Sequence, residues 1–347
     1  MHACAPGKII LSGEHSVVYG AQAIAIAIQK HTVVSFKPLS ESNTINTLFS
    51  GISSGVNYPL SALGSLKERL DSRFERFLAG SLPIKNILNK PDDLLMYTLS
   101  ALVHHLPVPG RLSSQSYLPM PGRLASTSDL PLGAGMGSSA SAIAATLVLF
   151  EHLLDKPLSV EQRFDMVRFC ERLQHGRGSA IDAAAVTYGG MNHVHQDAIT
   201  QLDKHIDNHW YWIFTGSPVV STGECVQYVR DHFAHELSLW DEFNQISAEL
   251  LAHLEQPAAL VNILKENHCL LNYIGVVPKT ALKLIDSIEQ AGGGAKISGA
   301  GAHKGDTGGL VIAYLPNDSI SQVMQAYPAY VWGSIEEDLQ GARYIGD

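Results

Sequence analysis

Cysteine is scarce in this sequence, and the few cysteines show no pairing. Among 347 residues there are four, and no two are separated by the short intervals of a disulfide framework or a zinc motif. They are Cys4, Cys170, Cys225 and Cys269. We therefore expect reduced thiols in a chain that works in the cytoplasm.

Long apolar runs are also missing. No uninterrupted apolar segment reaches the ~18 residues that cross a membrane. No charged segment followed by an apolar one opens the sequence, as it would in an export signal. We expect neither a membrane span nor an export signal.

Positive charge is in short supply. There are 24 Lys and Arg residues against 33 Asp and Glu, so the formal net charge is −9. No basic run occurs, which argues against nucleic acid as a partner. Histidine is frequent, with 16 residues, but none stands in a spaced ligand motif such as HExxH. We interpret the adjacent His104 and His105 as structural.

The sequence does contain enough apolar residues for two buried cores. Apolar residues make up 46% of the chain and charged residues 16%, as in a well-buried globular protein. The length fits two domains, and a change in the sequence pattern places the boundary near residue 195, giving domains 1–195 and 196–347. Periodicity and turn residues predict strands within 22–36, turns and short strands over 38–65, helices over 66–79, 91–106 and 158–174, a loop over 107–122, a strand at 209–216, mostly helix over 229–291, and a hairpin formed by 295–301 and 308–315.

A glycine-rich loop runs directly into an apolar segment at 131–150, PLGAGMGSSASAIAATLVLF. Gly133, Gly135 and Gly137 tolerate positive φ and let backbone N–H groups converge, and a helix start adds free N–H groups and partial positive charge. Such a loop binds anions, usually phosphate. We expect Ser138 or Ser139 to cap the helix, and the apolar face to anchor it. That face consists of Ile143, Leu147, Phe150 and Leu154. A tight turn before a buried helix is the alternative that the loop alone leaves open.

Three further motifs accompany the loop. Residues 5–20 read APGKIILSGEHSVVYG, residues 171–190 read ERLQHGRGSAIDAAAVTYGG, and residues 296–313 read KISGAGAHKGDTGGLVIA. In this order the three motifs resemble the GHMP kinases, and the first is most similar to the mevalonate kinases within that family. The resemblance spans nearly the whole chain and is sharp in these segments.

The resemblance implies a mixed α/β fold of two domains, an N-terminal one like ribosomal protein S5 and a C-terminal one like ferredoxin. It also implies transfer of the γ-phosphate of ATP to a small-molecule alcohol. Phosphoryl transfer needs positioning and charge neutralisation, which such a site would supply. The implied ATP-binding residues are Pro131, Gly133, Ala134, Gly135, Met136, Gly137, Ser138 and Ser139.

The resemblance also assigns the catalytic groups. Asp182 matches the family's base, and Lys8 matches the lysine that pairs with it. Asp182 lies among apolar residues, where burial would raise its pKa unless a cation compensates. Glu171 and Ser139, or else Ser138, match the ligands of a magnesium ion. The implied acceptor-side or cleft-shaping residues are Glu14, His15, Ser179, Thr222, Gly299, Ala300 and Gly301.

Some positions depart from the family pattern. Gly178 and Ala180 replace a proline and a glycine of the second motif, and His303 and Lys304 stand among the glycines of the third. The ending GDTGG resembles phosphomevalonate kinases, whereas GEHSVVYG favours mevalonate. A phosphorylated acceptor would need a basic cluster, for which Arg177 is the clearest candidate.

Several alternatives therefore stay open. The expected reaction is phosphorylation of the 5-hydroxyl of mevalonate with ATP and Mg²⁺. A phosphomevalonate kinase, another small-molecule kinase of the family, a decarboxylase of the superfamily and a catalytically inactive sensor are the alternatives. A homodimer is one option for the assembly.

Overall fold

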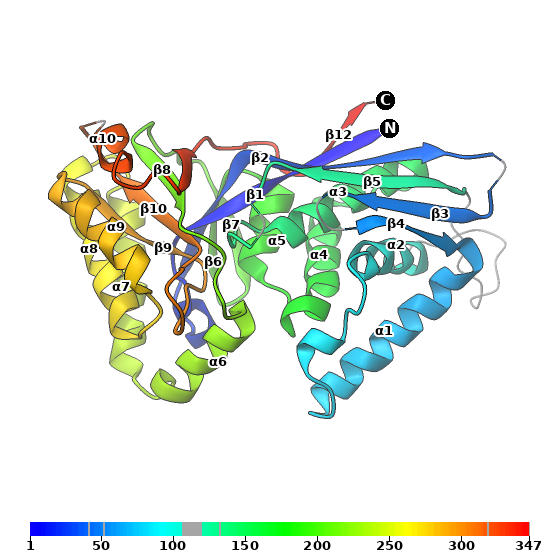
Figure 1. The fold of residues 1–347 in the computed structure, drawn as a ribbon, viewed down its shortest axis with the longest axis horizontal. Coiled ribbons are helices and arrows are strands. Elements are labelled where there is room, and N and C mark those ends of the chain that lie inside the picture. Colours follow the sequence, from blue (N-terminus) through cyan, green and yellow to red (C-terminus); the bar gives the residue numbers. More distant parts are fainter. Residues whose placement is uncertain (41, 51–52, 106–119, 132, 318, 347) are drawn as a thin grey trace.

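Two β-sheets with helices packed against them form the molecule (Figure 1). The computed structural model describes all residues except 41, 51–52, 106–119, 132, 318 and 347. Most of the loop expected over 107–122 therefore lies outside the described residues. The architecture is mixed α/β, which confirms the expected fold class.

The larger sheet has eight strands in the order β12-β1-β2-β5-β3-β4, with β6 pairing β2 and β7. Its strands are β1 (His2–Ser12), β2 (Ala23–Pro38), β3 (Thr44–Phe49), β4 (Ser53–Pro59), β5 (Gly122–Ser128), β6 (Met191–His195), β7 (Ala198–Leu202) and β12 (Arg343–Gly346). The accompanying helices are α1 (Leu63–Leu78), α2 (Asp93–His105), α3 (Ser138–Leu153), α4 (Val160–His175) and α5 (Ala180–Tyr188). Short 3₁₀ turns lie at Ser16–Tyr19, Leu60–Ala62 and Ile84–Asn86.

The smaller sheet has four antiparallel strands in the order β11-β8-β10-β9. They are β8 (Trp210–Phe214), β9 (Gly294–Ser298), β10 (Leu310–Tyr314) and β11 (Val331–Ser334). The helices of this half are α6 (Thr222–Phe233), α7 (Leu237–Ala252), α8 (Pro257–Tyr273), α9 (Lys279–Gln290) and α10 (Ile320–Met324). The antiparallel pairing of β9 with β10 confirms the expected hairpin.

The alternating sequence AIAIAI of β2 explains how the two halves join. Successive side chains of a strand point to opposite faces. Ala23, Ala25 and Ala27 pack in the core that contains α3, where small side chains let the helix approach the sheet closely. Ile24, Ile26 and Ile28 belong to a second core that also contains the first strand and helices of the smaller sheet. One strand therefore serves two cores, and the junction between the halves is apolar.

Most expected elements are present, but several observed elements were not predicted, including β1 with its 11 residues. The expected strands and helices over 22–36, 66–79, 91–106, 158–174 and 229–291 are confirmed within a few residues. The edge strands β7 and β12 were missed, and both join the larger sheet although they follow residue 195. The domain boundary at 195 thus remains a prediction. Within the described chain, no helix is both long and apolar enough to traverse a lipid bilayer.

Candidate active site

The glycine-rich loop adopts the backbone conformation that its sequence predicts. Gly133 and Gly135 both have φ 77° and Gly137 has φ 73°, in the left-handed region. Gly137, and neither serine, is the N-cap of α3, and no described side chain caps this helix. The expected cap at Ser138 or Ser139 is wrong because both residues already lie inside the helix. The uncapped N–H groups remain available to an anion.

The end of this loop lies against the first and second motifs. Lys8 donates its backbone N–H to the Met136 carbonyl at 2.9 Å, so the loop is fixed to β1. A Cβ added to Gly137 would come within 2.8 Å of Lys8 Cγ and 3.4 Å of Asp182 Oδ1. The α-carbon of Gly137 therefore faces the proposed catalytic pair directly.

Lys8 and Asp182 form an ion pair with 3.2 Å between Nζ and Oδ1. Lys8 comes from β1, and Asp182 from the first turn of α5, where Ser179 caps the helix by accepting the Asp182 N–H. Burial raises the pKa of Asp182, but Lys8, the Ser179 hydroxyl and His175 outweigh it, so the pKa is lowered. A cation thus keeps this enclosed carboxylate ionised and able to accept a proton.

Glu171 lies beside this pair, on α4, with a side chain only 2% exposed. Burial raises its pKa, and the Asp182 charge acts in the same direction, while His175, Ser139 and Lys8 oppose the rise. Its Oε1 is buried and has no hydrogen-bond partner among the described residues. An unused carboxylate oxygen beside a hydroxyl fits a magnesium ion, which takes few protein ligands and keeps phosphate oxygens and water.

Glu14 and His15, expected near the acceptor, lie in the turn after β1 and contact the third motif. Lys296 donates to Glu14 Oε1 inside the protein, and His15 Nε2 donates to the Ala300 carbonyl at 3.0 Å. Burial lowers the pKa of His15 to about 4, although the Ala300 bond opposes it. The imidazole is therefore neutral at physiological pH.

The remaining expected residues divide into those the fold brings together and those it does not. A Cβ on Gly135 would lie 4.0 Å from the Ser298 carbonyl, which places the third motif against the phosphate loop. Ala134 and Met136 are buried in the core that contains Ile24, Ile26 and Ile28 of β2. The Pro131 carbonyl accepts the Ala134 N–H at 3.2 Å. Thr222 is exposed in the first turn of α6, and the structure describes no contact between it and the other site residues.

Comparison with known proteins agrees with this geometry. The family model of the GHMP kinases N terminal domain matches residues 109–190. The mevalonate kinase of Pyrococcus abyssi is 30% identical over 326 residues, which is 90% of this chain and 88% of that protein. The chain belongs to the GHMP kinase family. It is an ATP-dependent small-molecule kinase.

Other relatives of this GHMP kinase support the same placement. The mevalonate kinase of Candida albicans is 28% identical over 92% of this chain and 82% of its own. The crystal structure of the Methanococcus jannaschii mevalonate kinase superposes with a TM-score of 0.79, covering 97% of this chain and 98% of that one at 18% identity. At that identity the structural likeness concerns the fold.

The departures from the family pattern have local explanations. A Cβ on Gly178 would lie 2.0 Å from the Arg168 carbonyl, so this position excludes any side chain. Arg177 is largely exposed and pairs with Asp197 at 2.8 Å. His303 stacks on Tyr228 with ring centroids 4.5 Å apart, whereas Lys304 is exposed.

Two residues of the site were missed by sequence reasoning. His175 follows Glu171 by four residues, so helical spacing alone puts it on the same face, 3.7 Å away. Lys296 offered one signal, a single lysine inside the apolar strand AKIS. Its partner Glu14 is 282 residues away in sequence, and no local pattern links the two.

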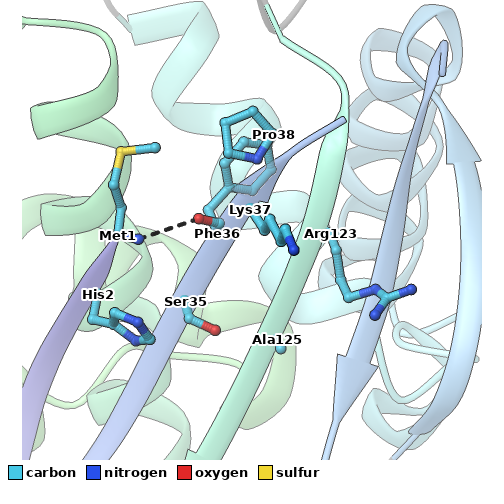
Figure 2. Close-up of a pocket in the computed structure, with 8 residues that line it drawn as sticks. All are labelled: Met1, His2, Ser35, Phe36, Lys37, Pro38, Arg123 and Ala125. Atoms are coloured by element: carbon cyan, nitrogen blue, oxygen red, sulfur yellow. Dashed lines mark hydrogen bonds between the residues drawn. The ribbon is translucent and has the colours of Figure 1, made fainter. Parts of the chain in front are cut away.

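A pocket of about 540 Å³ lies elsewhere, beside the start of β1 (Figure 2). Its lining residues are Met1, His2, Ser35, Phe36, Lys37, Pro38, Arg123 and Ala125. Figure 2 shows the Met1 amine directed at the Phe36 carbonyl, with the side chains of Lys37 and Arg123 nearby. None of the predicted site residues lines this pocket, so it is separate from the candidate active site.

Proposed function

We propose that this kinase transfers the γ-phosphate of ATP to the 5-hydroxyl of mevalonate, giving 5-phosphomevalonate and ADP. The observation that carries the proposal is the Lys8–Asp182 ion pair beside the uncapped N-terminus of α3. The choice of acceptor rests on relatives such as the Pyrococcus abyssi enzyme, whose name is mevalonate kinase.

The proposed mechanism gives each group a task. The backbone N–H groups of the glycine-rich loop and the start of α3 bind the phosphates of ATP. Asp182, with its lowered pKa, accepts the proton of the acceptor hydroxyl as that oxygen attacks the γ-phosphorus. Lys8 keeps Asp182 ionised and neutralises charge that develops on the transferring group.

Glu171 and Ser139 would hold the magnesium ion. When bound, Mg²⁺ neutralises charge on the phosphate oxygens and orients them for transfer. The unpartnered Oε1 of Glu171 supports this assignment. The Ser139 hydroxyl supports it too, since its hydrogen bond to the Glu171 carboxylate lowers the pKa of that group.

Mevalonate is favoured over its 5-phosphate by the charges around the second motif. Arg177, the clearest candidate for binding a phosphorylated acceptor, is largely exposed and paired with Asp197. The same Asp197 also accepts a hydrogen bond from Arg168 at 3.2 Å. The proximity of Lys8 and Asp182 favours catalysis over a sensor that has lost activity.

An acceptor panel tests the proposal. The purified protein is assayed for ATP- and Mg²⁺-dependent ADP formation with mevalonate, phosphomevalonate, homoserine and galactose. We expect turnover with mevalonate. Turnover with phosphomevalonate alone would overturn the acceptor while leaving the kinase assignment intact. A cytoplasmic location and a homodimer remain predictions beside this one.

A further inference from the structure

The proposed mechanism leaves a second buried ion pair without a task. Glu14 lies two residues beyond the end of β1, and Lys296 is the central residue of β9. Their side chains are 1% and 0% exposed, and Lys296 Nζ donates to Glu14 Oε1 and to the Ile297 carbonyl. Burial lowers the pKa of Lys296, and the Glu14 carboxylate opposes that shift.

The alternation of β9 sends Lys296 toward β1. Ala295 and Ile297 belong to the core shared with the helices of the smaller half. Lys296 and Ser298 point to the opposite face. There the Ser298 hydroxyl accepts the Ile10 N–H at 3.0 Å and donates to the Ile10 carbonyl at 2.9 Å. Lys296 therefore belongs to a polar seam that joins β9 to the strand that carries Lys8.

The turn after β1 holds the third motif at two points. Glu14 contacts Lys296, which precedes Gly299, and His15 contacts Ala300, which follows it. His15 reaches Ala300 from the left-handed region, at φ 59°, which is unusual for a residue other than glycine. These two contacts fix Gly299, and a Cβ on Gly299 would lie 4.0 Å from the Gly135 carbonyl.

Stability does not account for this pair. Removing two charges from water costs more than their attraction commonly returns, and apolar pairs of similar volume are often as stable or more stable. In addition, Glu14 Oε2 is buried without a hydrogen-bond partner among the described residues, which carries a further cost. A role in geometry explains why the chain keeps such an arrangement.

We propose that Lys296 is a positioning residue for the acceptor. By fixing the Glu14 carboxylate, it holds the turn after β1 against Gly299–Gly301 and so sets where the acceptor lies relative to Lys8 and Asp182. This inference rests on the proposed function for the identity of the acceptor.

The test compares Lys296→Met with Lys296→Arg. Loss of the cation should lower kcat/KM for mevalonate by roughly 10–100-fold, the scale of a small misplacement of reacting groups, with most of the loss in KM for the acceptor. The KM for ATP should change less than threefold. Lys296→Arg keeps a cation that can reach Glu14 and should recover at least half of the loss on a logarithmic scale.

Arg163→Met is the matched control. Arg163, in the first turn of α4, pairs at 2.8 Å with the buried Glu151 near the end of α3. Each residue lies at the opposite end of its helix from Glu171 or the glycine-rich loop. The loss of Arg163 therefore leaves another buried carboxylate without its cation. We expect a lower melting temperature in this variant with an unchanged KM for mevalonate. Equal KM increases in Arg163→Met and Lys296→Met would overturn the proposal, as would a folded Lys296→Met with wild-type kinetics. If Lys296→Met does not fold, Lys296→Gln takes its place under the same criteria.

Hydrogen exchange separates this inference from the acceptor assignment. The amides of Val17 and Ala302 bond to the carbonyls of Gly13 and Val276, so they report on the two held segments. Lys296→Met should accelerate the exchange of both amides relative to Arg163→Met. Unchanged protection would overturn the positioning role, even if the acceptor panel has shown that mevalonate is not the substrate.

Discussion

Two Lys–carboxylate pairs in one molecule differ in access. In the Lys8–Asp182 pair the side chains are 5% and 19% exposed, and Nζ lies 3.2 Å from Oδ1. In the Lys296–Glu14 pair they are 0% and 1% exposed. Both lysines lie on strands, and both carboxylates lie just beyond the end of a strand or at the start of a helix.

The difference in exposure matches the difference in proposed role. A group that takes a proton from a substrate must be reachable by it, which the partly exposed Asp182 satisfies. The Lys296–Glu14 pair is buried, and Glu14 Oε1 is already bonded to Lys296, so this oxygen cannot reach the acceptor hydroxyl. The pair's proposed contribution is to hold the turn after β1 against Gly299–Gly301. In these proposals a lysine paired with a carboxylate serves chemistry in one place and geometry in the other.

The largest expected effect separates the two pairs directly. Asp182→Asn keeps the shape of the side chain but removes the base, so kcat should fall by roughly 10²–10⁴-fold. The affinity for ATP, measured by titration, should change little because the loop backbone is intact. Near-normal turnover in Asp182→Asn would remove this residue from the mechanism. Neither ion pair would then have a catalytic role.

Sequence reasoning reached the first pair and missed the second for a physical reason. Lys8 and Asp182 each belong to a recognisable motif, and the resemblance pairs them. Lys296 is one lysine in a strand, and only the packing of β9 against β1 reveals that it is buried.

The same limit applies to backbone details. The φ values of the glycine-rich loop follow from its composition, but which residue caps α3 depends on where the helix begins. Strand β12 has four residues and little periodicity, so its pairing with β1 at the opposite end of the chain could not be predicted. Long-range pairing and helix boundaries are set by tertiary packing.

The next effect concerns the loop that faces the first pair. Gly137→Val should weaken ATP binding by at least about tenfold, since a misplaced loop loses contacts worth more than ~1.4 kcal/mol. Two causes combine. Gly137 has a left-handed φ of 73°, which a valine rarely adopts, and a Cβ at this position would lie only 2.8 Å from Lys8 Cγ. Titration with ATP, alongside thermal unfolding, measures the change.

Gly80→Val is the matched control for this substitution. Gly80 has nearly the same φ, 71°, but a Cβ there would meet nothing within 4 Å. It should therefore reproduce the backbone strain and leave ATP binding unchanged. A Gly137→Val protein that melts early yet binds ATP normally would show that the loop is only a turn.

Another enclosed carboxylate, Asp338, sharpens the comparison because it has no expected role in the reaction. It accepts hydrogen bonds from His31 at 2.6 Å and from Arg343 at 2.8 Å, and so fastens the chain before β12 to β2. Burial raises its pKa, but these partners and the Gln340 N–H outweigh it and lower the pKa to about 2.

The smallest effect on activity should come from Asp338→Asn, which should lower stability and leave kcat unchanged. A pKa depressed from 3.8 to about 2 corresponds to about 2 kcal/mol of stability at neutral pH. Because the folded pKa is the lower one, this stabilisation is full above about pH 4 and is lost as the pH falls toward 2. Urea unfolding of the wild type and of Asp338→Asn should therefore show a difference in the free energy of unfolding. This difference should be constant between pH 7 and pH 5 and should narrow below pH 4. A difference that widens in acid would contradict this account, and a folded variant with reduced kcat would mean that Asp338, like Lys296, acts on the site.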